Sequence, residues 1–87
     1  MYLYLGQDTV VPMREVVGIF DMDNTTIAKS TRDFLSDAEK RGQVITVSME
    51  LPKSFVVCNS KTNGMTVYIS QISCATLLKR AEAIRRN

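Results

Sequence analysis

The fold of this chain depends on one stretch, Val16-Val17-Gly18-Ile19-Phe20-Asp21-Met22-Asp23-Asn24-Thr25-Thr26. Its first part is apolar at nearly every position, which predicts a strand over Glu15–Asp21 that is buried on both faces. Gly18 in the middle of this strand predicts a bulge or a close approach of another backbone segment. The polar residues Asp23–Thr26 can cap a helix, and we expect that helix to run to about Arg41.

An apolar strand that ends in Asp-x-Asp-x-Thr resembles the first motif of the haloacid dehalogenase-type phosphatases. That resemblance implies a nucleophile at Asp21 and a general acid/base at Asp23, beside a Mg²⁺ ion. Phosphoryl transfer also needs further acidic ligands and cations that neutralise the phosphoryl oxygens. Downstream, the acidic residues fall on a predicted helix or stand alone, without the second Asp pair that the motif requires. We therefore expect no enzyme, no metal site and no cofactor.

The length and composition indicate one small domain over residues 1–87, 45% hydrophobic and 23% charged, as is ordinary for globular proteins. A chain of this size buries only about 60–65% of its unfolded surface, so self-association would add stability. No apolar run approaches the ~20 residues that span a bilayer. The N-terminus lacks the basic segment and long apolar segment of a signal peptide. We expect a cytoplasmic protein without a membrane partner.

The absence of histidine excludes Ser-His and Cys-His dyads and most zinc sites. Cys58 and Cys74 lack Cys-x-x-Cys spacing, which favours two buried, reduced thiols. Cys74 stands in the first turn of a predicted helix, a position that would make its thiol more acidic.

On both sides of Val16–Thr26, the alternation of apolar and polar residues and the positions of turn residues predict further strands and helices. The additional strands are expected over Tyr2–Leu5, Thr9–Val11, Gln43–Val47, Ser54–Asn59 and Met65–Ser70. Gly42 is expected to stop the first helix, Lys61–Gly64 to form a hairpin turn, and Ser73 to cap a last helix running to about Arg86. The order β-β-β-α-β-β-β-α predicts an α+β domain with a mostly antiparallel sheet and two helices. The phosphatase motif would need alternating strands and helices instead.

Four segments carry a second resemblance that covers nearly the whole chain: Met1–Gly6, Arg14–Asp21, Pro52–Val57 and the run from Ser70 to Arg80. In this order and spacing they are similar to the RemA/RemB family of bacterial extracellular matrix regulatory proteins, and closest to its RemB branch. The resemblance implies a small α+β protein that assembles into rings and presents basic residues to double-stranded DNA. It further implies a nucleoid-associated regulator that activates transcription of biofilm-matrix genes.

The resemblance can be carried to particular residues. Arg14 matches the Arg that follows the second strand in the DNA-binding branch. The family's basic run between the fourth and fifth strands falls on Met49–Lys53, where only Lys53 is positive and Glu50 and Leu51 replace two cations. This exchange removes about two phosphate contacts per subunit, each of which would contribute about 0.9 to the salt slope. Several copies in an oligomeric ring would compensate, because weak contacts add through effective concentration.

We therefore predict a homo-oligomeric regulator that contacts DNA phosphates through Arg14 and Lys53, with Arg32 and Lys29 widening the basic surface. The cations near the C-terminus stand behind them as candidates, although they also suit the end of a helix: Lys79, Arg80, Arg85 and Arg86. Little base reading is expected, because no predicted helix carries Asn or Gln beside Arg on a basic face. The alternative is a protein-interaction scaffold that keeps the ring, has lost DNA binding, and contacts a protein partner through the Glu50/Leu51 loop.

Overall fold

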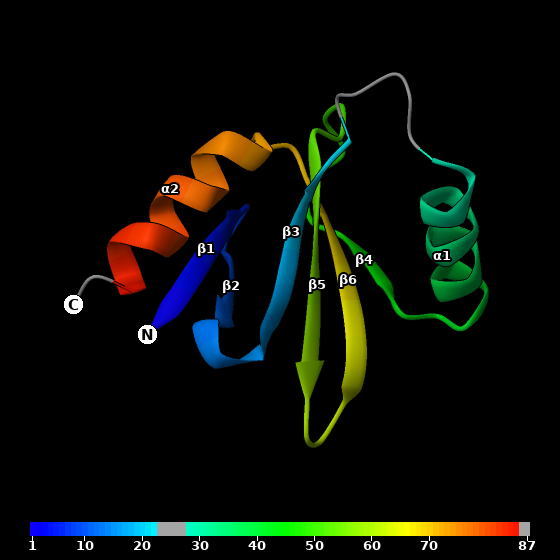
Figure 1. Cartoon of the computed structure of the whole chain (residues 1–87), viewed down its shortest axis with the longest axis horizontal. Helices are drawn as coiled ribbons and strands as arrows, with labels where there is room; N and C mark the ends of the chain where they lie inside the picture. The colour runs from blue at the N-terminus through cyan, green and yellow to red at the C-terminus, as the bar shows by residue number, and fades with distance from the viewer. Residues whose placement is uncertain (23–27, 86–87) are drawn as a thin grey trace.

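The computed structural model describes residues 1–22 and 28–85, and Figure 1 shows the elements in chain order. The strands and helices are β1 (Tyr2–Gly6), β2 (Thr9–Pro12), the short 3-10 helix η1 (Met13–Glu15), β3 (Val16–Asp21), α1 (Lys29–Lys40), β4 (Val44–Thr46), β5 (Ser54–Ser60), β6 (Gly64–Ser70) and α2 (Cys74–Arg85). The predicted order and the α+β class are confirmed. Within the described residues, no helix has the length and apolar character needed to cross a membrane.

The strands divide into two sheets, a division that the sequence did not predict. β1 and β2 form an antiparallel two-stranded sheet, and the other strands form a four-stranded sheet in the order β3-β5-β6-β4. β3–β5 and β5–β6 are antiparallel, whereas the short β4 runs parallel to β6. β3 and β4 are therefore the two edges of the larger sheet.

The larger sheet lies between two layers (Figure 1). On one side, β1, β2 and α2 form a core with β5, made of Leu3, Leu5, Val11, Val56, Cys58, Leu77 and Ala81. On the other side, Ala38 of α1 packs with Phe55, Val57 and Val67. β5 is one of the two inner strands of this sheet, and its side chains enter the two cores alternately.

The prediction that β3 is buried on both faces is wrong. Val17 is 67% exposed and Phe20 is 45% exposed. The reason is that β3 is an edge strand: α2 packs against it on one face, whereas α1 lies over β4 and β6 and leaves the other face of β3 open.

The predicted bulge at Gly18 is confirmed by a shift in register between Val16 and Gly18 in the pairing with β5. The extra residue explains why Val16 and Ile19, three positions apart, both pack against the core on the α2 side. A Cβ atom at Gly18 would lie 2.7 Å from the aromatic ring of Phe20.

Two buried serines join the sheets. Ser54 and Ser70 are directly opposite each other in β5 and β6, and both are 0% exposed. Ser70 Oγ donates to Leu5 O at 2.8 Å and accepts from the Ile72 N–H at 3.0 Å, while Ser54 Oγ donates to Ile72 O at 2.7 Å. These bonds fix β1 and the β6–α2 connection to the central strands.

The helix and hairpin ends agree in part with prediction. Ser73 Oγ accepts from the Thr76 N–H at 3.2 Å and so caps α2 as predicted. The cap candidates at Asp23–Thr26 lie outside the described residues, and Ala28 precedes α1 without a side-chain hydrogen bond. Gly42 follows α1 at φ 71°, as a stop residue should, and the predicted hairpin joins β5 to β6.

Candidate nucleic-acid interface

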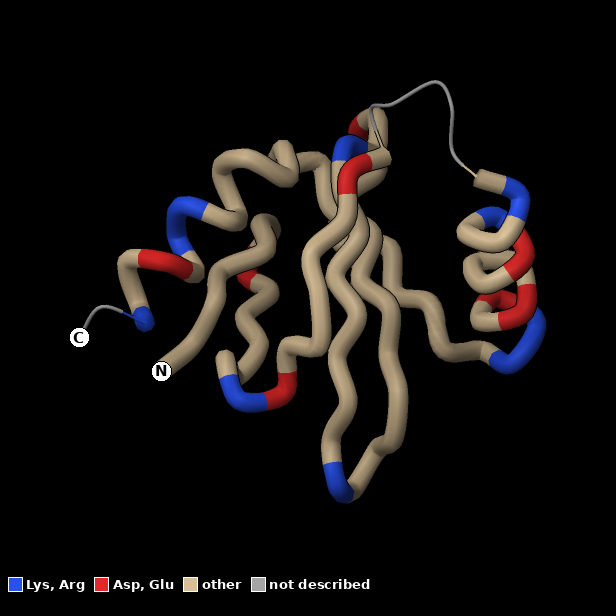
Figure 2. Tube along the Cα trace, in the orientation of Figure 1, with Lys and Arg blue, Asp and Glu red and all other residues tan. Residues whose placement is uncertain are grey.

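Arg14 and Lys53, the first candidates for phosphate contact, lie at opposite ends of the larger sheet. Arg14 is in η1, just before β3, and Lys53 immediately precedes β5, which runs antiparallel to β3. The six residues of β3 separate them by roughly 20 Å. Figure 2 shows cations at both ends of the sheet and on both helices. The structure does not bring these two candidates together within one subunit.

Lys53 has a fixed backbone and an exposed side chain. Its N–H donates to Ser70 O at 2.9 Å, and its carbonyl accepts from the Met22 N–H at 2.9 Å. Asp21, at the end of β3, lies at the same end of the sheet, and Glu50 precedes Lys53 by three residues in the chain. The electrostatic surroundings of Lys53 are therefore mixed in sign.

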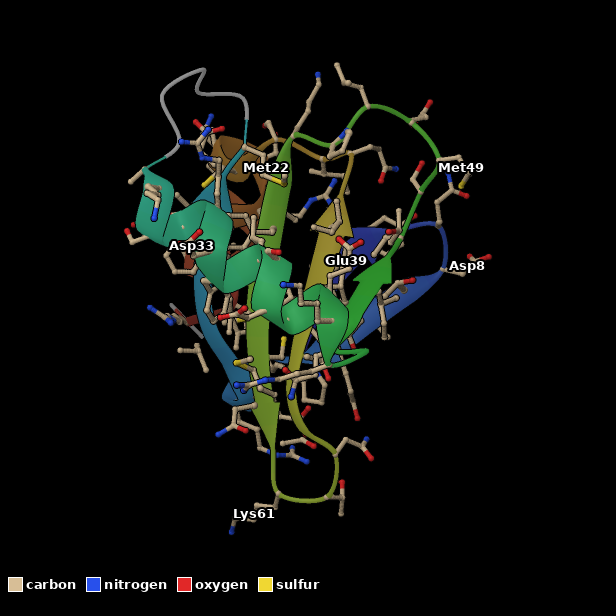
Figure 3. All side chains as sticks on the ribbon, turned by 90° about the vertical axis from the view of Figure 1, so that its right-hand side faces the viewer. Asp8, Met22, Asp33, Glu39, Met49 and Lys61 are labelled. Carbon is tan, nitrogen blue, oxygen red and sulfur yellow. The ribbon has the colours of Figure 1, made fainter. Side chains whose placement is uncertain are left out.

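The loop before Lys53 is strongly exposed. Leu51 is 78% exposed and Met49 is 98% exposed, and Figure 3 shows Met49 at the outer rim of the molecule. The Glu50 N–H donates to Ser48 Oγ at 3.1 Å, which gives the loop a local hydrogen bond. An exposed apolar tip of this kind suits contact with another protein.

Arg14 lies beside the β5–β6 hairpin, where a polar cleft of about 480 Å³ opens. The cleft is lined by Arg14, Glu15, Asn59, Ser60, Lys61 and Thr62. Lys61 is at the hairpin tip, as Figure 3 shows. Sequence reasoning placed Lys61 in a turn and missed it as a site residue, since its proximity to Arg14 depends on the pairing of β3 with β5.

Lys29 and Arg32 are on α1, on the other side of the larger sheet from α2. Lys29 Nζ is 3.5 Å from Asp33 Oδ2, an exposed ion pair that contributes little stability. α1 carries three cations and three carboxylates, so the helix is neutral overall. Asp33 and Glu39 lie on its outer side in Figure 3. The structure does not join Lys29 and Arg32 to Arg14 in one basic surface.

The basic residues near the C-terminus differ in their surroundings. Arg80 Nη1 donates to Tyr4 O at 3.3 Å, and the Arg80 guanidinium lies 5.6 Å from the centroid of the Tyr4 ring. Arg80 therefore helps to hold α2 against β1. Lys79 and Arg85 are exposed, and Arg86 lies outside the described residues.

Asp21, the nucleophile of the phosphatase hypothesis, does not lie on the kind of sheet that the phosphatase motif requires. Asp21 ends an edge strand that pairs antiparallel with β5, whereas the phosphatase motif sits on a parallel sheet. Asp23 lies outside the described residues.

The two cysteines are free thiols without acidic character. Burial, followed by the charge of Glu15, raises the pKa of Cys58 to about 11. The expectation that the start of α2 makes Cys74 more acidic is wrong, because burial and then Asp21 raise its pKa. The Cys74 thiol is half-buried and lies 3.8 Å from Ile19 O.

An apolar groove runs between α1 and the open face of β3. Val17, Phe20 and Phe34 are among its exposed lining residues, and its volume is about 440 Å³. Phe20 stacks on Phe55 with ring centroids 4.9 Å apart and planes at 17°. Val17 and Phe20 belong to β3, so the groove borders an edge strand of the larger sheet.

These features define a small α+β domain with a polar cleft, an apolar groove and exposed cations, whose described residues show no phosphatase framework. Residues 2–81 match the RemA-like family, described as extracellular matrix regulatory protein A-like, and the chain belongs to this family. The chain is also 35% identical over 82 residues to extracellular matrix regulatory protein B of Bacillus subtilis (strain 168), an alignment that covers 94% of this chain and 91% of that protein. The RemA/RemB resemblance is thereby confirmed.

Proposed function

We propose that the protein is a non-enzymatic, homo-oligomeric regulator of extracellular matrix genes that binds double-stranded DNA through its phosphates. The proposal rests mainly on the exposed side chain of Arg14. Its side chain is exposed and, among the described residues, has no hydrogen-bond or ion-pair partner. A guanidinium can bind a phosphate with two parallel hydrogen bonds.

Self-association is the second part of the proposal. The groove beside Val17 and Phe20 leaves apolar surface exposed, and β3, which carries both residues, is an edge strand of the larger sheet. A domain of 87 residues has a modest core, so covering this surface would stabilise it. A closed ring of identical subunits would also repeat Arg14 on one surface. Weak phosphate contacts would then add.

Such a regulator acts on the nucleoid in the cytoplasm and needs little base-specific contact. α1 is neutral overall and α2 uses Arg80 to hold β1, so neither helix resembles a basic recognition helix. Binding would follow phosphate spacing and duplex shape.

The test is fluorescence anisotropy of a labelled duplex of about 40 base pairs at several salt concentrations, together with sedimentation to measure the size of the protein. We expect an oligomer whose binding weakens steeply with salt, and a shallower salt dependence for Arg14→Gln. Lys40→Gln is the matched control, because it removes one exposed positive charge from the end of α1. An oligomer that fails to bind DNA even at low salt would refute the DNA part of the proposal.

The alternative is a scaffold that contacts a protein through the Met49–Leu51 loop. It is favoured by the exposure of Met49 and Leu51 and by Glu50, whose carboxylate would repel phosphate. The variant Leu51→Ser separates the two functions in a strain that reports matrix-gene expression. Under the DNA-binding proposal this change leaves DNA affinity and expression intact. Loss of expression with unchanged DNA affinity would favour the scaffold.

A further inference from the structure

We infer that Arg14 and Lys61 of one subunit form a phosphate clamp in the cleft beside the β5–β6 hairpin, and that Lys61, not Lys53, is the cation that acts with Arg14. The inference deepens the proposed function and rests on it for the source of the phosphate, a phosphodiester of duplex DNA. The clamp itself stands on the geometry of the cleft.

Two well-fixed elements bring the two cations together. η1 follows Pro12 and ends where the Val16 N–H donates to Met13 O. Val16 is opposite Cys58 in the β3–β5 pairing, so η1 lies against the last residues of β5. Arg14 and Lys61 therefore line the same cleft, although 46 residues separate them in the chain.

The hairpin turn that carries Lys61 has its own supports. The Asn63 N–H donates to Ser60 Oγ at 2.8 Å. Gly64 closes the turn at φ 70°, a conformation that glycine adopts without strain. A fixed turn limits the conformational entropy lost when Lys61 holds a ligand.

The side chains around the cleft suit an anion of phosphate type. Arg14 offers a planar set of donors and Lys61 a compact positive charge, while Asn59 and Thr62 add neutral donors. Glu15 is the acidic lining residue, so the six lining residues keep a net charge of +1. The volume of about 480 Å³ falls within the range of small-ligand sites, about 300–1,000 Å³.

Both cations are available. Among the described residues, neither Arg14 nor Lys61 forms an ion pair or a side-chain hydrogen bond, in contrast to Lys29, which is paired with Asp33. Lys53 cannot join Arg14 on the same phosphate, because the length of β3 separates them by roughly 20 Å.

The experiment compares Lys61→Gln, Arg14→Gln and the control Lys40→Gln in the full chain, with the duplex titration at several salt concentrations. We expect Lys61→Gln and Arg14→Gln each to lower the salt slope by about 0.9 for every subunit that touches DNA. Lys40→Gln, which carries the same change in net charge, should leave the slope unchanged. Lys61 is exposed in a turn, so the variant should fold, and circular dichroism verifies this.

A second measurement uses inorganic pyrophosphate as a probe and needs no DNA. We expect the phosphorus-31 resonance of pyrophosphate to broaden in the presence of the protein, and less so with Arg14→Gln or Lys61→Gln. DNA binding with Lys61→Gln indistinguishable from Lys40→Gln would overturn the clamp and leave the proposed function standing. Pyrophosphate binding that needs both cations, without any DNA binding, would support the clamp and refute the proposed function. Failure to bind either duplex or pyrophosphate would overturn both.

Discussion

Replacing Ser70 by Ala should destabilise the protein more than any other removal of a single hydroxyl among the residues described above. The fully buried Ser70 hydroxyl makes two hydrogen bonds, a buried one to Leu5 O and a partly buried one from the Ile72 N–H. The substitution to Ala leaves both backbone groups without a partner. Each unsatisfied buried group costs about 1–3 kcal/mol, so we expect a loss of about 2–4 kcal/mol in the free energy of unfolding. A domain of this size has only about 5–15 kcal/mol in total.

Ser54→Ala is the internal comparison, since Ser54 is equally buried but donates only one hydrogen bond, to Ile72 O. We expect a loss of about 1–2 kcal/mol for this variant. Ser36→Ala on the exposed surface of α1 is the control and should stay within about 0.5 kcal/mol of wild type. Urea unfolding followed by circular dichroism, at one fixed protein concentration, measures all three variants. A Ser70→Ala variant as stable as the Ser36→Ala control, or more stable than Ser54→Ala, would refute this account of how the sheets are joined.

Four further changes test other features. Gly18→Ala should displace the Phe20 ring, from which a new Cβ would be 2.7 Å away, and lower the unfolding free energy by about 1 kcal/mol; an unchanged melting temperature would contradict this. The free energy of unfolding should fall as pH rises from about 9 to about 11, because the Cys58 thiol ionises near 9.0 in the unfolded chain and near 11 in the folded protein. In urea unfolding, the Cys58→Ala variant should not show this fall. Val17→Asp should reduce the sedimentation coefficient if the apolar groove is a subunit interface, and an unchanged coefficient would move the interface elsewhere. Glu50→Arg should raise affinity for duplex DNA and steepen its salt dependence, and equal affinity at low salt would place the loop away from DNA.

Local signals in the sequence predicted most of the fold. Alternation predicted β1, the Asn-Gly pair predicted the β5–β6 turn, and Ser73 predicted the start of α2. The edge position of β3 could not be predicted, because an apolar run shows that a strand is hydrophobic but not which strands flank it. The parallel pairing of β4 with β6 and the separation of β1–β2 into a second sheet depend likewise on long-range contacts.

The candidate site, too, could be predicted only in part from the sequence. Sequence reasoning named Arg14 and Lys53 as cations, but it could not place them at opposite ends of an antiparallel pair. Lys61 was assigned only to a turn. Lys61 lies across the cleft from Arg14 because Val16 pairs with Cys58, and no local sequence pattern predicts that pairing.

The core on the α2 side joins two segments that lie more than 70 residues apart in the sequence, and this separation affects how the protein folds during synthesis. Leu3 and Leu5 of β1 pack with Leu77 and Ala81 of α2, so β1 meets these partners only after synthesis has passed residue 81. Until then Leu3 and Leu5 have no complete core to enter, and contacts between such distant positions form slowly. A nascent chain that stops before α2 would expose these leucines to chaperones and proteases. We therefore expect β1 to enter this core only after α2 has emerged from the ribosome.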